Sequence, residues 1–134
     1  MQLLFYSNGV DKDSERLETA VHRVIPEGCI EHFTKLEDFG NRLRRPVEAD
    51  SVAVLLTSTR EELEKMRQLR GLLTEIYVVL VLPDLLKGTI KIAHQLLPRF
   101  LSQKNSDFAD LKVVLNRMYA NSQKSREREL FREG

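Results

Sequence analysis

Five short apolar segments alternate along the chain with stretches in which apolar residues recur every three or four positions. The apolar segments are residues 3–6, 29–33, 51–56, 76–82 and 99–102. Segments 51–56 and 76–82 are apolar for most of their length, which is typical of strands buried on both faces of a parallel sheet. The weaker segments 29–33 and 99–102 are predicted to be edge strands.

The stretches between these segments predict helices, because each carries one apolar stripe at helical spacing. The stripes are formed by Leu17, Val21 and Val24, by Leu36, Phe39 and Leu43, by Leu63, Met66, Leu69 and Leu73, by Ile90, Ala93 and Leu97, and by Phe108, Leu111, Leu115 and Met118. The fourth helix is expected from about Leu85 to Leu97, where Pro98 ends it. A strand–helix order repeated five times with short links predicts a doubly wound three-layer α/β/α sandwich, because crossovers between parallel strands are right-handed. The expected fold is flavodoxin-like, with a five-stranded parallel sheet of order 2-1-3-4-5.

The predicted α/β domain covers residues 1–119, and a more polar segment follows at residues 120–134. This segment contains four basic and three acidic residues, and its apolar residues do not keep a coiled-coil spacing. We interpret it as a charged C-terminal helical extension or a flexible tail. Leu130 and Phe131 are its candidates for docking onto the domain.

The composition is that of an ordinary globular domain, with 42% hydrophobic and 31% charged residues. The 21 Lys and Arg residues nearly balance the 20 Asp and Glu residues, for a net charge of +1. This balance argues against nucleic acid or an anionic membrane as the main partner. The longest apolar stretch, near residues 76–86, is too short to span a bilayer and contains Pro83. The start, MQLLFYSNG, lacks the character of a signal peptide. We therefore expect a cytoplasmic location.

The sequence offers no clustered metal ligands. Cys29 is the single cysteine, and His32 would lie on the opposite face of the same predicted strand. His22 and His94 fall on other elements, and no zinc-binding spacing occurs. The Ser-Asn-Gly sequence at residues 7–9 could bind a phosphate through backbone N–H groups, as in a flavin site, but it is also an ordinary turn. We predict no metal and no cofactor.

Residues 1–119 resemble the receiver domains of two-component response regulators, in the small stand-alone class typified by the chemotaxis regulator. The resemblance rests on the order and length of the predicted elements. Within it, three stretches resemble bacterial receiver-like domains of unknown role. These stretches are VVLVLPD (78–84), LLPRFLS (96–102) and DFADLKVVLNRM (107–118).

The resemblance implies where phosphoryl chemistry should lie. A working receiver holds two Mg²⁺-binding acids after strand one, a phosphorylated Asp at the end of strand three, a Ser or Thr after strand four and a Lys after strand five. In this chain the places of the two acids fall on Tyr6 and Ser7, or on Ser7 and Asn8, and the place of the phosphorylated Asp falls on Thr57 or Ser58. The place of the Ser or Thr falls on Leu82 or Pro83, and the place of the Lys falls on Lys104. Only the lysine matches. The expected pocket is therefore degenerate, and it consists of Ser7, Asn8, Thr57, Ser58, Asp84 and Lys104.

These observations predict a non-enzymatic signalling module that binds a protein partner, a degenerate receiver without the phosphoacceptor Asp and the Mg²⁺-binding acids. By resemblance, the partner face consists of Lys91, His94, Gln95, Arg99 and Arg117. A weak homodimer is compatible with this architecture. Two alternatives stay open. One is a small-ligand domain that binds a flavin or nucleotide at residues 7–14, and the other is a receiver phosphorylated on a displaced acid, Asp84 or Asp11.

Overall fold

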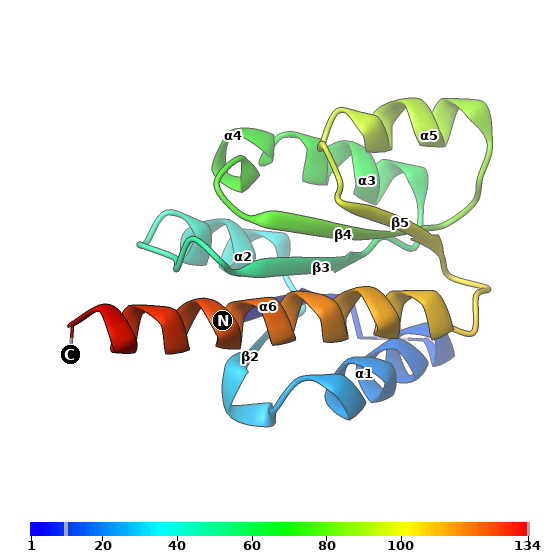
Figure 1. Cartoon of the computed structure of the whole chain (residues 1–134). Coiled ribbons are helices and arrows are strands. Elements are labelled where there is room, and N and C mark those ends of the chain that lie inside the picture. Colours follow the sequence, from blue (N-terminus) through cyan, green and yellow to red (C-terminus); the bar gives the residue numbers. More distant parts are fainter. Residues whose placement is uncertain (10, 134) are drawn as a thin grey trace.

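Strands and helices alternate along the computed structural model, which describes residues 1–9 and 11–133, the last five of these by their backbone alone (Figure 1). The strands are β1 (Leu3–Tyr6), β2 (Ile30–Phe33), β3 (Val52–Leu56), β4 (Tyr77–Leu82) and β5 (Phe100–Gln103). The helices are α1 (Lys12–Val24), α2 (Leu36–Leu43), α3 (Arg60–Arg67), α4 (Arg70–Leu73), α5 (Lys87–His94) and α6 (Ala109–Glu133). A short 3₁₀ helix, Glu27–Cys29, precedes β2.

The strands form one parallel sheet in the order β2-β1-β3-β4-β5. At the end of β1, Tyr6 pairs with Phe33 on one side and with Leu55 on the other. The weaker strands β2 and β5 form the two edges of the sheet. The predicted sheet order and the flavodoxin-like three-layer sandwich are thereby confirmed.

Helices cover both faces of the sheet, and successive residues of each strand point to opposite faces. Val54 and Leu56 pack in the cluster that includes residues of α1 and α6, whereas Ala53 and Leu55 pack in the cluster that includes residues of α2, α3 and α5. Figure 1 shows the same two layers, with α1 and α6 on one side of the sheet. All four residues have no exposed surface, as expected for a strand that is covered on both faces.

The third predicted helix is in fact two helices. α3 ends at Arg67 and α4 begins at Arg70. Between them, the N–H groups of Gln68 and Leu69 donate to carbonyl groups three residues back, at 3.2 and 2.9 Å. This tighter turn interrupts the α-helical bonding without changing the apolar spacing from Leu69 to Leu73, so the sequence pattern could not reveal the break.

Other predicted boundaries also move, and β3, β4 and β5 each begin one residue later than expected. Cys29 lies in the 3₁₀ helix, and β2 begins one residue later at Ile30. The fourth predicted helix is shorter than expected: α5 covers Lys87–His94, and Leu97 has a left-handed φ of 49° that a helix interior does not allow.

The C-terminal helix α6 continues without a break through residue 120 and reaches Glu133. The side chains of Leu130 and Phe131 lie outside the described part of the chain. Within residues 1–9 and 11–133, neither α6 nor any other helix is both long and apolar enough to cross a membrane.

Candidate functional site

The carboxyl ends of the parallel strands meet at one edge of the sheet, which is where ligands bind in folds of this kind. Ser7, Thr57, Pro83 and Lys104 directly follow the ends of β1, β3, β4 and β5. Backbone hydrogen bonds of 2.9–3.0 Å to a neighbouring strand fix the N–H groups of Ser7, Thr57 and Lys104. The candidate site is therefore this edge together with the loops that leave it.

The loop after β1 offers mainly backbone groups. Ser7 is 1% exposed, and its hydroxyl has no hydrogen-bond partner among the described residues. Asn8 is half-buried, and Gly9 turns the chain with a φ of +76° that favours glycine. Asp11 caps α1 by accepting the N–H of Ser14 at 2.9 Å. A ligand bound to this loop would meet the backbone and Asn8 before it met the Ser7 hydroxyl.

Thr57 is one of the two positions, with Ser58, where the resemblance places the phosphoacceptor, and its hydroxyl is directed into the sheet. The residue is fully buried. Its backbone N–H and its hydroxyl both donate to the carbonyl oxygen of Val81, each at 3.0 Å. The hydroxyl is therefore committed to a neighbouring strand and is not presented to a ligand.

The structure places a carboxylate at this edge, but it belongs to Glu62 of α3 and does not follow β3 directly. Thr59 caps α3 by accepting the N–H of Glu62 at 3.1 Å, and Glu62 Oε2 accepts the N–H of Ser58 at 3.4 Å. Burial, followed by the charge and hydrogen bonding of Glu62, raises the pKa of Tyr6 well above its ordinary value. The spacing Thr59-x-x-Glu62 signals the capping box, but nothing in the sequence signals that this carboxylate lies against Tyr6.

Asp84 follows the end of β4 and lies in a group of polar side chains. Its Oδ1 accepts the N–H of Leu86 at 3.0 Å. A hydrogen bond from Thr89, then the bond from Leu86, and then the positive charges of Arg60 and Lys104 lower the pKa of Asp84. The structure thus brings together Asp84 and Lys104 from the predicted pocket and adds Thr89, which the sequence reading missed.

Arg60 connects α3 to the first turn of α5. Its Nε donates to the hydroxyl of Thr89, which is fully buried, at 3.1 Å. Its guanidinium also packs on Gly88, where an added Cβ would lie 2.9 Å from Nη1. Glycine at position 88 therefore permits the close approach of Arg60 to α5.

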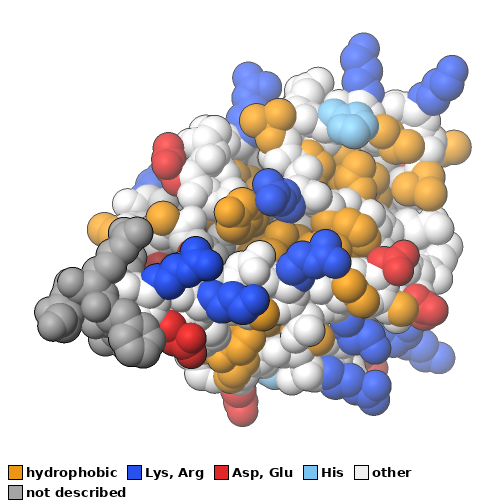
Figure 2. Space-filling model, viewed as in Figure 1, with side chains coloured by type: hydrophobic (Ala, Val, Ile, Leu, Met, Phe, Trp, Pro, Cys, Tyr) orange, Lys and Arg blue, Asp and Glu red, His pale blue; other side chains and the backbone are white. Residues whose placement is uncertain are grey.

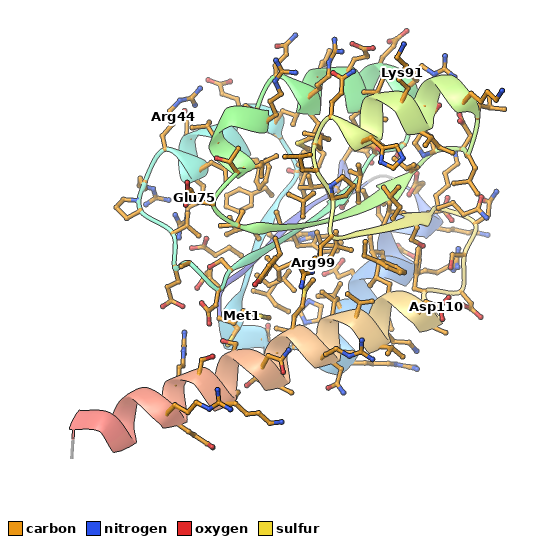
Figure 3. The ribbon with its side chains drawn as sticks, turned by 45° about the horizontal axis from the view of Figure 1, so that its top comes forward. Met1, Arg44, Glu75, Lys91, Arg99 and Asp110 are labelled. Atoms are coloured by element: carbon orange, nitrogen blue, oxygen red, sulfur yellow. The ribbon has the colours of Figure 1, made fainter. Side chains whose placement is uncertain are left out.

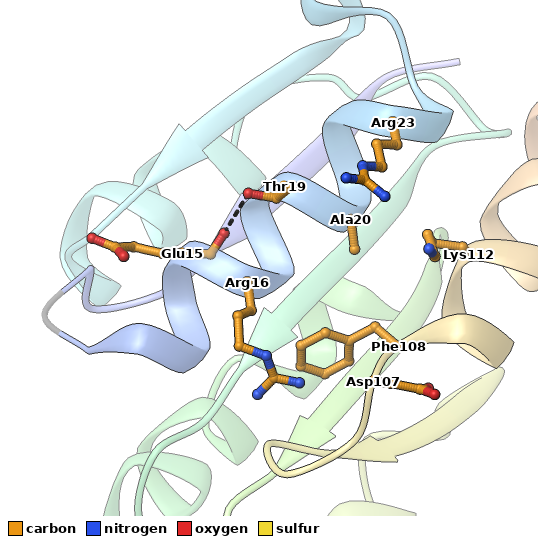
Figure 4. A pocket seen from close by; sticks show the side chains of 8 residues that line it. All are labelled: Glu15, Arg16, Thr19, Ala20, Arg23, Asp107, Phe108 and Lys112. Atoms are coloured by element: carbon orange, nitrogen blue, oxygen red, sulfur yellow. Dashed lines mark hydrogen bonds between the residues drawn. The ribbon is translucent and has the colours of Figure 1, made fainter.

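Arg16 of α1 holds the loop that follows Lys104. It donates hydrogen bonds to the carbonyl oxygens of Lys104, at 3.3 Å, and of Ser106, and it pairs with Asp13 at 3.0 Å. Its guanidinium lies 5.0 Å from the centroid of the Phe108 ring, a cation–π distance. Arg16 and Phe108 line an open hollow of 380 Å³ between α1 and α6. Figure 4 shows their side chains beside each other. These contacts fix the backbone from which the Lys104 side chain extends.

In the described part of the chain, no group of three or more His, Cys, Asp or Glu side chains could hold a metal ion. Glu62 and Asp84 reach this edge from α3 and from the loop after β4. Neither follows β1, where the two Mg²⁺-binding acids of a receiver are expected, and Asp11 in the loop after β1 caps α1.

The predicted partner face is mostly exposed. Lys91 and His94 on α5, Arg99 before β5 and Arg117 on α6 are all exposed. Figure 3 shows Lys91 on α5 and Arg99 between the sheet and α6. Gln95 differs, because it is half-buried and accepts a hydrogen bond from Arg67 of α3 at 3.0 Å. It therefore contributes to the packing of α5 on α3.

No protein-family model matches the chain, and no curated protein or solved structure is similar enough to count as a match.

Proposed function

We propose that the chain is a non-catalytic signalling module that binds a protein partner, built on a receiver-like fold whose phosphoryl chemistry is lost. The observation that carries the proposal is the state of Thr57. The residue at the end of β3 is a buried threonine whose hydroxyl is bonded to Val81, not an exposed carboxylate. An acyl phosphate needs a carboxylate nucleophile and a hard divalent cation needs clustered carboxylates, and position 57 supplies neither.

The proposal is tested by NMR with BeF₃⁻ and Mg²⁺, which together mimic a phosphoryl group on a carboxylate. The spectrum of the full chain is expected to stay unchanged on addition of both. Saturable shifts clustered around Thr57 would contradict the proposal, because they would mean that this edge binds the phosphoryl mimic.

A second candidate function has one observation in its favour, which is the grouping of Asp84 with Thr89 and Lys104. In this reading, a carboxylate oxygen of Asp84 attacks the phosphorus of acetyl phosphate and acetate leaves. Mass spectrometry after treatment with acetyl phosphate distinguishes the two functions. A mass increase of one phosphoryl group that is absent in Asp84→Asn would favour this second function over the first.

A further inference from the structure

The small net charge of the chain conceals an uneven distribution of charged residues along the sequence. Residues 1–84 contain 11 Lys and Arg against 15 Asp and Glu, a net charge of −4. Residues 85–126 contain eight Lys and Arg against two acids, Asp107 and Asp110, a net charge of +6. The last eight residues contain two basic and three acidic residues, a net charge of −1. Such an asymmetry within a chain indicates a charged partner.

The cationic segment forms one side of the molecule. Residues 85–126 include α5, β5 and most of α6, which lie together at the β5 edge of the sheet (Figure 1). Figure 2 shows Lys and Arg side chains spread over this side, and acidic side chains are few there. Neither α5 nor β5 contains an acidic residue.

Apolar side chains are exposed on the same side. The exposed large hydrophobic residues of the described chain are Tyr77 (41%), Leu85 (53%), Leu86 (62%), Leu97 (77%) and Val113 (56%). Four of these five belong to the cationic segment, and the fifth, Tyr77, lies 5.1 Å from the guanidinium of Arg99. Figure 2 shows hydrophobic side chains exposed between α5 and α6 with cationic side chains among them. Exposed apolar side chains that gather in this way mark a binding surface.

We call this region the β5-edge surface and define it by six residues of α5, of α6 and of the segments that flank α5 and β5. They are Leu86, Ile90, His94, Leu97, Arg99 and Arg117. β5 pairs only with β4 in the described sheet, so its outer backbone groups also belong to this side.

The charge of the β5-edge surface decides between candidate occupants. A second copy docked through the same surface would bring two cationic surfaces together, and like charges across an interface cost several kcal/mol by order of magnitude. Nucleic acid would neutralise the cations, but its phosphates offer nothing to the exposed leucines. A protein segment with both carboxylates and apolar side chains satisfies both features, because it can place apolar anchors centrally and charges at the rim.

We propose that the β5-edge surface binds an acidic amphipathic segment of a partner protein. Its apolar side chains pack against Leu86, Ile90 and Leu97 along α5 and its flanks. Its Asp and Glu side chains face Arg99 and Arg117. This inference rests on the proposed function and specifies the chemistry of the partner.

The probe is a synthetic peptide of about 18 residues, long enough to form a helix, made of Glu, Ala and Leu with leucines at helical spacing. In ¹⁵N NMR titrations, saturable shifts are expected in α5, β5 and α6, and binding is expected to weaken as ionic strength rises from about 0.05 to about 0.3 M. The double variant Arg99→Glu/Arg117→Glu is expected to bind at least about tenfold more weakly. Leu86→Gln tests the apolar part and should also weaken binding.

Matched controls distinguish binding at the β5-edge surface from a general effect of the protein's charge. The variant Arg44→Glu/Arg45→Glu makes the same charge change at exposed positions after α2 and should leave the affinity within about twofold. A peptide with Lys in place of Glu, and one with the same composition in shuffled order, should bind less tightly than the probe.

Several outcomes overturn the inference. They are the absence of saturable binding to the acidic peptide, binding that Arg99→Glu/Arg117→Glu leaves intact, and tighter binding to duplex DNA or anionic vesicles that the peptide cannot displace. A dimer in sedimentation equilibrium that Arg99→Glu/Arg117→Glu abolishes overturns it as well, in favour of self-association. None of these results changes the response to BeF₃⁻ and Mg²⁺, so the proposed loss of phosphoryl chemistry is tested separately.

Discussion

The hydroxyl of Thr57 and its backbone N–H share one acceptor, the carbonyl oxygen of Val81, at 3.0 Å each. The end of β3 is therefore bound to β4 by a side chain as well as by the backbone. A carboxylate at position 57 would instead direct negative charge at a buried carbonyl oxygen. Thr57, one of the two positions that the resemblance gives to the phosphoacceptor, thus serves the packing of the sheet.

Substitutions at position 57 should separate a structural role from an open pocket. Thr57→Val keeps the shape and leaves Val81 bonded to the backbone N–H, so we expect a loss of about 1 kcal/mol in the free energy of unfolding. Thr57→Asp buries an unpaired charge, and we expect a loss of about 3 kcal/mol or more. Urea denaturation measures both. If Thr57→Asp were as stable as Thr57→Val, the side chain would have to face solvent and the structural role would be wrong.

The grouping around Asp84 makes a prediction about proton binding. Thr89 donates the hydrogen bond that contributes most to lowering the pKa of Asp84, so Thr89→Val should raise this pKa toward its ordinary value. Lys104→Gln should raise it less, because the charge of Lys104 lowers this pKa less than the hydrogen bond from Thr89 does. The measurement is a pH titration of the Asp84 carboxyl carbon by ¹³C NMR. An unchanged pKa in Thr89→Val would mean that the two side chains are not bonded in solution.

Most of the fold follows from local apolar patterns. The continuous apolar residues of β3 and β4 require burial on both faces, and short links between strands leave few arrangements other than order 2-1-3-4-5. The ends of helices were less predictable where the backbone geometry changed but the spacing of the apolar residues did not. The break between α3 and α4 and the left-handed residue Leu97 after α5 are of this kind.

The site was predictable only in part, because its side chains come from helices as well as strand ends. The sequence placed Thr57 and Lys104 at the right edge of the sheet. It could not show that Thr57 is bonded inward, or that Arg60 crosses from α3 to Thr89, since both depend on contacts between distant segments. The sequence contains the division between the acidic residues 1–84 and the basic residues 85–126, but the net charge of +1 for the whole chain does not reveal it.

Leu97 and Phe108 share a left-handed backbone but should respond oppositely to glycine. Leu97 has a φ of 49° and is 77% exposed, whereas Phe108 has a φ of 62° and is 1% exposed. Glycine relieves the strain in both, but Phe108→Gly also removes a buried ring. We expect Leu97→Gly to be stabilising by up to about 1 kcal/mol. Phe108→Gly should lose about 3–5 kcal/mol. Thermal and urea unfolding measure the difference, and a large loss in Leu97→Gly would show that its side chain packs in solution.

Asp50 ties the loop before β3 to the distal half of α6. Its carboxylate accepts a hydrogen bond from the buried hydroxyl of Ser122 and lies 3.6 Å from the N-terminal amine of Met1. A parallel ion pair joins Glu48 to Arg126 at 2.6 Å. Burial alone would raise the pKa of Asp50, but the Ser122 bond, the amine and Arg126 together outweigh burial and lower it.

This lowered pKa makes the stability of the α6 contact depend on pH. An unfolded Asp titrates near pH 3.9. The stabilisation from Asp50 is therefore complete above about that pH, and it is lost as the pH falls through the lower folded-state pKa. Asp50→Asn should lose about 1 kcal/mol at neutral pH, a modest value because the carboxylate is partly exposed. The difference from the unsubstituted chain should shrink below about pH 4. The control Glu75→Gln removes a charge at an exposed position and should change stability little. Urea denaturation at several pH values measures this, and a loss in Asp50→Asn that stays constant down to about pH 2 would show that the carboxylate charge does not hold α6.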